Sequence, residues 1–336
     1  MAELISSAHN PKIKQLLSLQ EKSKLRRELG LFVVEGVREI ERCVEAGFEA
    51  DSLFVCPEIA EPRKWSEGFA SAFEDFRVCG TGLLDSPLAD SRGQGTGLLD
   101  SPLADSREQG TGLLDSPLAD SRGHGTVYTG FGSETFKVEN RTRKARIFEV
   151  TKEIYSKIAY RESTEGIIAE FKTKDLRLQD LKLSPSPLLI VLESVEKPGN
   201  LGAVLRSADA AGADAVLICD PLTDLYNPNL IRASLGARFS VQCSACTSSE
   251  AIKWLKAKGI RILTAQLQDS SWYYNTDMTK GTAIVIGTES CGLSDSWRNS
   301  ADAHIKIPML GTVDSLNASV SAAILLFEAV RQRNSL

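Results

Sequence analysis

The sequence contains few of the residues that build metal sites or disulfide frameworks. Only three histidines occur in 336 residues, and His9, His124 and His304 lie far apart. The seven cysteines are an odd number scattered along the chain, which favours reduced thiols. Cys243 and Cys246 form a lone CxxC pair without further ligands in the sequence nearby. We therefore expect structural cysteines and no bound metal, with a metal or redox role as the less favoured alternative.

The sequence also lacks long apolar runs. No stretch approaches the ~20 apolar residues that span a bilayer, and the first residues lack the basic-then-apolar pattern of a signal peptide. Apolar residues make up 42% and charged residues 25% of the chain, as in ordinary globular proteins. We expect a cytoplasmic protein with no membrane partner.

An overall excess of positive charge is absent as well. The formal net charge of −5 argues weakly against a nucleic-acid partner, but it hides local basic runs. Six basic residues and one acid lie between Lys12 and Arg27, and a second cluster spans Arg141–Arg146. Each run could be a solvated helix face, or it could bind phosphates. The candidate phosphate-binding residues are Lys12, Lys14, Arg143 and Lys144.

A tandem repeat is the most conspicuous feature that is present. A 15-residue unit begins at Gly80 and recurs at Gly95 and Gly110, with a proline in the middle of each copy. Proline blocks a continuous helix and glycine raises the cost of ordering the chain. The repeats at 80–124 are predicted to be a flexible insertion, with a short solenoid or a partner-binding arm as the alternative.

An α/β pattern surrounds this insertion. It predicts a small α/β domain over residues 1–182, followed by a linker within 180–187 that contains Ser-Pro-Ser-Pro. The predicted strands are 31–34, 51–56, 146–150 and 166–171, and the predicted helices are 11–29, 35–46 and 152–159.

Residues 186–336 show a more regular alternation of apolar runs and helical stretches. This alternation predicts a second α/β domain with a parallel sheet covered on both faces and a ligand at the carboxyl ends of its strands. The predicted strands are 188–192, 215–219, 261–264, 283–287 and 304–307, and the predicted helices are 200–211, 249–258 and 315–332.

Three loops at strand ends carry unusual polar residues. The first contains Asn200, Gly202 and Arg206, the second is Gly287–Gly292, and the third runs from Ile307 to Val320. Taken singly they have ordinary explanations. Asn200 and Ser315 could be helix caps, Arg206 a surface charge, and the second loop a plain turn.

In their order and spacing, the three loops resemble the motifs of the SpoU family of RNA ribose methyltransferases, which are TrmH-like members of the SPOUT superfamily. The resemblance extends from about Leu188 to Arg333. Phe32–Gly36 and Ser163–Ala169 resemble the family's small substrate-binding domain, which is similar to RNA-binding ribosomal proteins. The repeats depart from the family pattern and bear on substrate choice more than on chemistry.

The resemblance implies methylation of a ribose 2′-hydroxyl in structured RNA with S-adenosylmethionine as the methyl donor. It also implies a C-terminal trefoil knot and a homodimer with the active site near the interface. Ribosomal RNA is the favoured substrate because of the added N-terminal domain. A transfer-RNA methyltransferase and a non-catalytic RNA-binding homologue are the alternatives.

The matching positions supply candidate site residues. Gly287, Ile307 and Leu316 would bind the cofactor, and the catalytic or site-shaping residues would be Arg206, Asn200, Glu289, Ser315 and Asn317. Arg206 could bind a neighbouring phosphate bidentately and stabilise the developing alkoxide, since a guanidinium that stays protonated in proteins is a poor general base. Asn200 and Asn317 would orient the nucleotide or Arg206, and Glu289 would hold the knot loop.

A class I Rossmann methyltransferase or a dehydrogenase is the enzymatic alternative. Such a protein should carry a glycine-rich fingerprint directly after an early strand. The turn after Leu192 instead reads Glu-Ser-Val-Glu-Lys-Pro-Gly-Asn, which disfavours this class.

Overall fold

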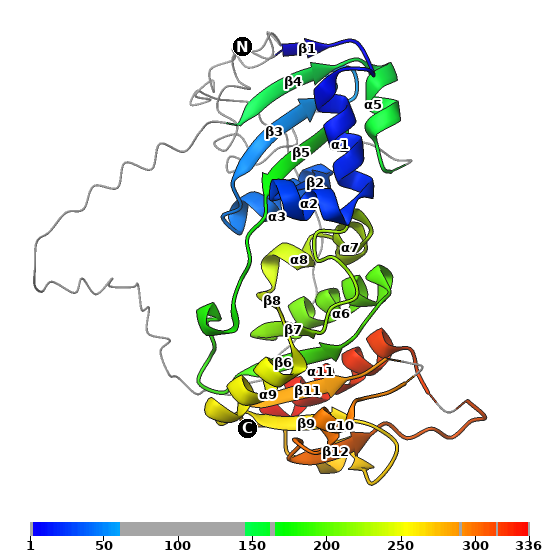
Figure 1. Ribbon diagram of the computed structural model, residues 1–336. Coiled ribbons are helices and arrows are strands. Elements are labelled where there is room, and N and C mark those ends of the chain that lie inside the picture. Colours follow the sequence, from blue (N-terminus) through cyan, green and yellow to red (C-terminus); the bar gives the residue numbers. More distant parts are fainter. Residues whose placement is uncertain (1–2, 61–144, 162–164, 289–290, 314, 335–336) are drawn as a thin grey trace, which may run out of the picture. The chain divides into compact units, whose positions relative to one another are not determined.

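The computed structural model describes residues 3–60, 145–161, 165–288, 291–313 and 315–334. These residues form two β-sheets with helices packed on them (Figure 1). The predicted insertion at 80–124 and the candidate residues Arg143, Lys144 and Glu289 lie outside the described residues. Within the described ranges, no helix combines the length and apolarity needed to cross a membrane.

The smaller sheet is built from the N-terminal part of the chain. Its strand order is β1-β4-β3-β5-β2, with β5 antiparallel to β3 and β2 and the remaining pairs parallel. The predicted strands are confirmed, and β1, which is only three residues long, was missed. The strands are β1 (Glu3–Ile5), β2 (Leu31–Glu35), β3 (Ala50–Val55), β4 (Arg146–Val150) and β5 (Ile167–Lys172). The accompanying helices α3 (Val37–Glu45) and α5 (Lys152–Ile158) are close to prediction.

The predicted helix over 11–29 is wrong in one respect, because it is two helices. Lys22 is extended (φ −105°, ψ 105°) and separates α1 (Pro11–Glu21) from α2 (Ser23–Leu29). The break leaves carbonyls at the end of α1 without helical donors, and the Arg26 guanidinium donates to those of Leu19 and Gln20. Arg26 is only 2% exposed and also pairs with Asp224 at 2.6 Å. Arg26 therefore lies in the interior and not on a solvated basic face.

The larger sheet consists of seven strands that all pair in parallel, as predicted. Their order is β10-β12-β9-β11-β6-β7-β8, so β7 and β8 lie on one side of β6 and β9–β12 lie on the other. The short strands β8 and β10 were not predicted. The strands are β6 (Leu188–Glu193), β7 (Ala215–Cys219), β8 (Cys243–Cys246), β9 (Arg261–Ala265), β10 (Ser271–Trp272), β11 (Thr282–Ile286) and β12 (Ala303–Lys306).

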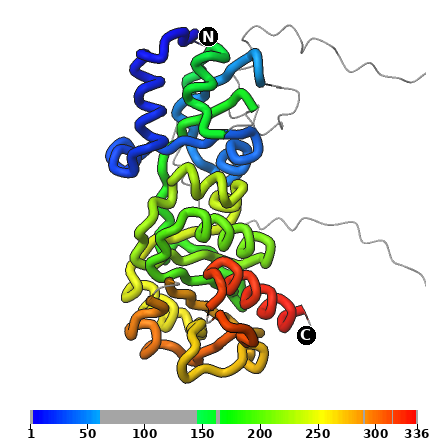
Figure 2. The backbone as a smooth tube through the Cα atoms, turned by 90° about the vertical axis from the view of Figure 1, so that its right-hand side faces the viewer, coloured from blue at the N-terminus to red at the C-terminus, as the bar shows by residue number. Residues whose placement is uncertain are grey.

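Helices cover both faces of this sheet. On one face, α6 (Pro198–Ala210) and α11 (Ala318–Asn334) pack beside each other (Figure 2) and share a core with α7 (Pro228–Ser234) and α8 (Ala237–Ser240). On the other, α9 (Ser248–Ala257) and α10 (Asp295–Arg298) cover a second core that contains Trp297. Coverage of both faces explains why the central strands read as continuous apolar runs.

The smaller sheet shares a core with α7 and α8. Phe32 of β2 packs against Tyr226 and Phe239, with ring centroids 4.3 and 5.9 Å apart. The backbone N–H of Lys174 also donates to the Tyr226 hydroxyl at 2.8 Å. The smaller sheet thus packs on the α7–α8 region through an aromatic cluster.

The CxxC pair lies on β8, and its cysteines belong to different cores. Cys243 packs on the α6 face and Cys246 on the α9 face, because residues three apart on a strand point to opposite sides. Cys246 instead contacts Cys219 of β7, with the sulfur atoms 3.8 Å apart. Among the described residues, no group of three or more ligand-type side chains could hold a metal ion.

Candidate functional site

A pocket of about 360 Å³ opens at the carboxyl ends of β9, β11 and β12. This is where a ligand was predicted, and the volume falls in the range of small-molecule sites. The predicted cofactor residues Gly287, Ile307 and Leu316 all line it. The predicted loops after β11 and β12 therefore converge on one cavity.

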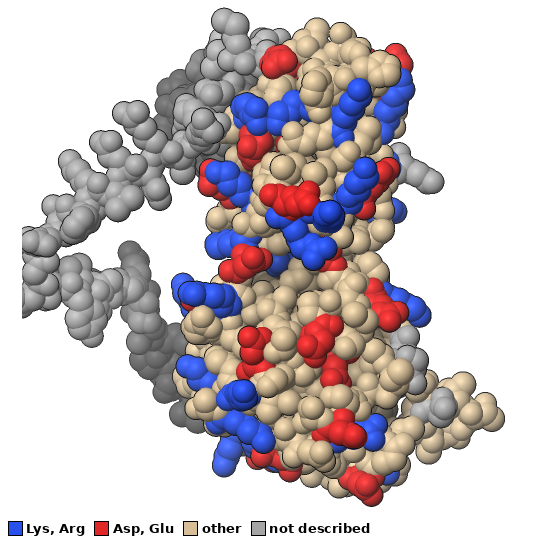
Figure 3. All heavy atoms as spheres, in the orientation of Figure 1, with Lys and Arg blue, Asp and Glu red and all other residues tan. Residues whose placement is uncertain are grey.

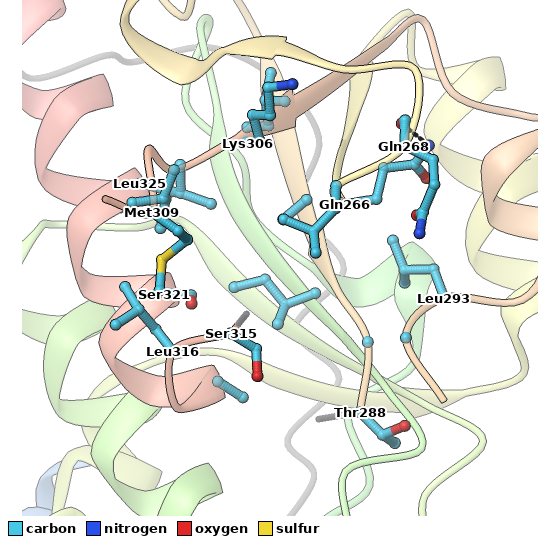
Figure 4. A pocket seen from close by; sticks show the side chains of 18 of the residues that line it. Gln266, Gln268, Thr288, Leu293, Lys306, Met309, Ser315, Leu316, Ser321 and Leu325 are labelled. Atoms are coloured by element: carbon cyan, nitrogen blue, oxygen red, sulfur yellow. Dashed lines mark hydrogen bonds between the residues drawn. The ribbon is translucent and has the colours of Figure 1, made fainter. Parts of the chain in front are cut away.

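The two sides of the pocket come from different parts of the fold (Figure 4). Leu316, Met309, Ser321 and Leu325 lie on the side of α11, and Gln266, Gln268 and Leu293 lie opposite. Ser315 also lines the pocket and is exposed.

The loop after β11 turns back on itself at the pocket. Thr288 and Gly292 form an antiparallel bridge, and the Gly292 N–H donates to the Thr288 carbonyl at 3.0 Å. A Cβ on Gly287 would lie 2.2 Å from the Gly292 carbonyl oxygen. Glycine at 287 is therefore required by the loop's own close packing.

Sequence reasoning missed several lining residues that follow strand ends. Gln266 comes directly after β9, and its Oε1 is buried without a hydrogen-bond partner among the described residues. Lys306 ends β12 and lies over the Trp272 ring, with 5.0 Å between the ammonium and the ring centroid. Cys291 also lines the pocket and is exposed, unlike Cys43, Cys56, Cys219 and Cys243, which are buried. The rule that ligands meet the carboxyl ends of parallel strands could have indicated Gln266 and Lys306.

The two candidate asparagines are brought together from positions 117 apart in the sequence. Asn317 Nδ2 donates to Asn200 Oδ1 at 3.1 Å. Asn317 Oδ1 accepts from the backbone N–H of Ser319 at 2.9 Å and from its hydroxyl at 2.6 Å. Asn317 thus satisfies an orphan donor at the start of α11.

The helix of the first motif, α6, begins at Pro198, two residues before the predicted start at residue 200. Pro198 occupies the first turn of α6 and Lys197 is the N-cap residue, so the capping role considered for Asn200 is wrong. Gly202 faces α7, where a Cβ would lie 2.5 Å from the Ala233 Cβ. Gly202 therefore permits close helix packing.

Arg206 does not line the pocket that holds Ser315 and Leu316. It is exposed on α6 and lines a second cavity, with no hydrogen bond or ion pair to any residue that the structure describes. The structure thus places Asn200 next to Asn317, and it places Ser315 in the pocket with the predicted cofactor residues. Within a single chain, Arg206 lies outside this pocket.

The two described candidates for RNA binding differ in their surroundings. Lys14 is exposed, whereas the Lys12 side chain is 20% exposed and lies 3.9 Å from Glu170 and 4.0 Å from Asp51. Burial raises the pKa of Glu170 to about 7, although Lys12 lowers it. Lys12 thus pairs with the buried carboxylate of Glu170. On the face drawn in Figure 3, Lys and Arg side chains lie among Asp and Glu, without one continuous basic surface over the coloured residues.

These features define an α/β protein that binds a small molecule at the carboxyl ends of its parallel strands. A doubly wound parallel sheet carries a small-molecule pocket at its strand ends, where α/β proteins bind cofactors. An asparagine pair at the starts of two helices lies on the same domain.

Comparisons with known proteins specify the family. Residues 187–327 match the model of the SpoU rRNA Methylase family, and residues 10–76 match an MRM3-like substrate binding domain. The chain is 37% identical over 191 residues to the 23S rRNA (guanosine-2′-O-)-methyltransferase RlmB of Vibrio vulnificus, covering 55% of this chain and 77% of that protein. The crystal structure of an RNA 2′-O ribose methyltransferase is 30% identical with a TM-score of 0.67, over 98% of this chain and 99% of that one. The chain belongs to the SpoU rRNA methylase family.

A further relative marks the extent of the similarity. The chain is 35% identical over 152 residues to the 23S rRNA (uridine(2479)-2′-O)-methyltransferase of Streptomyces viridochromogenes. That match covers 44% of this chain and 53% of the relative.

Proposed function

We propose that the protein transfers a methyl group from S-adenosylmethionine to a ribose 2′-hydroxyl of ribosomal RNA. The convergence of Gly287, Ile307 and Leu316 on one pocket at the strand ends carries this proposal. It agrees with the activities of two relatives, which are 23S rRNA methyltransferases. Both relatives act on ribosomal RNA, which favours that substrate over transfer RNA.

The pocket residues suit S-adenosylmethionine chemically. Apolar side chains of Ile307, Leu316 and Leu325 offer surface for an adenine ring, and the orphaned Gln266 Oε1 offers an acceptor for an amino group. Arg298 and Lys306 also line the pocket and could pair with the cofactor's carboxylate. The bound cofactor supplies an activated methyl group with its own leaving group.

The chain's own residues position the ribose and assist loss of its proton. Arg206 binds a phosphate next to the target ribose and stabilises negative charge that develops on the 2′-oxygen. The Asn200–Asn317 pair fixes the starts of α6 and α11 relative to each other and presents amide groups to the nucleotide. Ser315 lies at the pocket with an exposed hydroxyl and can orient the ribose.

We also propose a C-terminal trefoil knot, formed by the loops after β11 and β12. The self-packing of Gly287 on Gly292 supports a compact loop there. A cytoplasmic location follows from a ribosomal RNA substrate.

A homodimer is supported by an apolar stripe on α11. Val320 and Phe327 are 46% and 48% exposed, and Ala323 and Ile324 lie half-buried between them. Such a stripe on a helix is typical of an interface. The separation of Arg206 from the cofactor pocket supports a site that a second copy completes.

Mixing two inactive variants tests the dimer and the shared site together. Arg206→Ala removes the arginine, and Ser321→Phe places a ring in the cofactor pocket. If the site is shared, refolding an equal mixture should restore roughly a quarter of wild-type activity, because half the dimers are mixed and each has one intact site. No recovery would place Arg206 and the pocket of one site on the same chain, and light scattering at monomer mass would exclude the dimer.

Two measurements test the function itself. Isothermal titration should show binding of S-adenosylmethionine, which a non-catalytic RNA-binding homologue would lack. Mapping of ribose methylation in cells with and without the gene should then reveal a site in ribosomal RNA that depends on the protein. A missing mark in transfer RNA alone would favour the alternative substrate.

A further inference from the structure

The second cavity, of about 520 Å³, is an arginine-lined site that the proposed roles use only through Arg206. It lies where α3 packs against α8 and where α6 packs against α7 and α8 (Figure 1). Its charged lining residues are Arg38 and Arg42 of α3 and Arg206 and Asp209 of α6. Three cations and one anion therefore face one open space.

The Arg42 side chain passes over the turn between α7 and α8, whose backbone leaves space for it. The turn between α7 and α8 uses left-handed conformations at Leu235 (φ 51°) and Gly236 (φ 86°). A Cβ on Gly236 would lie 2.5 Å from the Arg42 Cδ, so the glycine leaves room for the arginine stem. Arg42 is half-buried and has no hydrogen bond or ion pair to any described residue. Its guanidinium is partly desolvated without a counter-charge.

Of the two neighbouring acids, Glu39 is paired with arginines, whereas Asp209 keeps its negative charge in the cavity. Glu39 is 1% exposed and binds both Arg38 and Arg161, each at 2.9 Å. Burial opposes its ionisation, but these two arginines hold the pKa of Glu39 below its usual value. Asp209 accepts a hydrogen bond from the Ser240 hydroxyl at 2.6 Å. The cavity thus keeps an excess of positive charge at Arg42 and Arg206.

A phosphodiester matches this arrangement. Guanidinium groups bind phosphate oxygens through two parallel hydrogen bonds, and a partly desolvated arginine gains more from such a partner than an exposed one. Because α3 belongs to the N-terminal part and α6 to the methyltransferase part, a bound RNA strand would contact both.

We propose that Arg42, with Arg38 beside it, binds a backbone phosphate of the substrate RNA next to the nucleotide that Arg206 serves. This inference rests on the proposed RNA methyltransferase function and makes Arg42 a positioning residue. The cavity adds a phosphate subsite on the N-terminal part of the chain, in a helix outside the basic runs of the sequence.

The test measures affinity for a transcript of large-subunit ribosomal RNA by filter binding at several salt concentrations. Arg42→Gln should weaken binding about tenfold and reduce the slope of log K against log salt by about 0.7–0.9. Arg42→Lys should restore the slope but little of the affinity, because lysine keeps the charge without the planar fork. Arg177→Gln is the matched control, since Arg177 is an exposed arginine already paired with Asp180 at 2.8 Å.

Several results would overturn the inference. Unchanged affinity and slope for Arg42→Gln, or an equal loss for Arg177→Gln, would exclude a specific phosphate contact. Dissociation of the dimer by Arg42→Gln, seen by light scattering, would assign the cavity to a second copy of the chain.

A kinetic readout separates positioning from simple binding. At saturating RNA, Arg42→Gln should still slow single-turnover methyl transfer, with an effect that is not additive with that of Arg206→Gln. Full additivity would remove the positioning role. Wild-type protein that binds this RNA through Arg42 but methylates no ribosomal RNA would refute the proposed function and leave the phosphate contact standing.

Discussion

The two sheets of this protein handle buried charge differently. The central strands of the larger sheet bury apolar side chains on both faces, and its polar candidates lie beyond the strand ends. The smaller sheet places Glu170 in the middle of β5, where it is fully buried next to Lys12. Substitutions at the carboxyl ends of the strands in the larger sheet should therefore change activity, whereas substitutions around Glu170 should change the stability of the fold.

The largest expected effect is at Gly287. A valine there would collide with the Gly292 backbone and force the loop away from the pocket, so Gly287→Val should abolish binding of S-adenosylmethionine in a calorimetric titration. The melting temperature should fall only slightly, because the loop lies beyond the end of β11. A variant that binds the cofactor normally would show that the loop does not shape the site. Global unfolding of the variant would contradict the expectation that changes at the strand ends of the larger sheet affect activity and not stability.

Arg206→Ala should reduce single-turnover methyl transfer about 100-fold, which is about 2.7 kcal/mol of transition-state stabilisation. Its affinity for the cofactor and its melting temperature should stay unchanged, because Arg206 lies outside the cofactor pocket and has no partner among the described residues. Arg206→Lys should rescue little. Near-normal transfer would refute the catalytic role, and a lower melting temperature would make the residue structural.

Glu170 should make the stability of the smaller sheet depend on pH. Its pKa of about 7 in the folded protein lies above the ordinary value of 4.5, mainly because of burial. The folded state therefore binds this proton more tightly, and the stability it confers is lost as pH rises from about 4.5 to 7. Glu170→Gln should be more stable than wild type at pH 8 by up to about 3 kcal/mol, with the difference vanishing near pH 5. Urea titrations at both pH values measure this.

The control for this experiment is Glu149→Gln, which changes a partly exposed carboxylate on β4 of the same sheet. It should show no comparable rise in stability between pH 5 and pH 8. A pH-independent effect of Glu170→Gln would mean that Lys12 keeps the carboxylate ionised throughout.

The smallest effects separate Lys12 from Lys14. Lys12→Glu puts a like charge beside Glu170 and should cost about 1–3 kcal/mol of unfolding free energy, whereas Lys14→Glu should change it by less than about 0.5 kcal/mol. Lys14→Glu should instead weaken RNA binding and flatten its salt dependence. If both variants behave alike, the basic run on α1 is a single surface and the assignment of Lys12 to the interior is wrong.

The sequence predicted the larger sheet better than the smaller one for a physical reason. Strands buried on both faces read as apolar runs whatever surrounds them, so five of the seven were found. β8 was missed because Cys-Ser-Ala-Cys suggested a ligand pair, and β10 because two residues carry no pattern. Arg26, which follows the break at Lys22, pairs with Asp224 across 198 positions, and no local window of sequence contains such a contact.

The candidate site shows the same limit. The resemblance to the SpoU motifs identified Gly287, Ile307 and Leu316, and they meet in one pocket because residues that follow neighbouring parallel strands lie at one edge of the sheet. The Asn317–Asn200 hydrogen bond and the placement of Arg206 in another cavity depend on how α6 and α11 pack, which the motifs do not encode. Arg42 lay outside every basic run, so only the turn at Gly236 reveals it.

The exposed thiol of Cys291 at the pocket offers a site for chemical labelling. Among the described cysteines it is the one classed as exposed, while Cys246 is half-buried and the others are buried. Of the cysteines in the described ranges, Cys291 should therefore react first with a maleimide dye, and a ligand seated in the pocket would shield its sulfur. The rate of alkylation thus becomes a footprint of cofactor occupancy, readable by mass spectrometry without any RNA present.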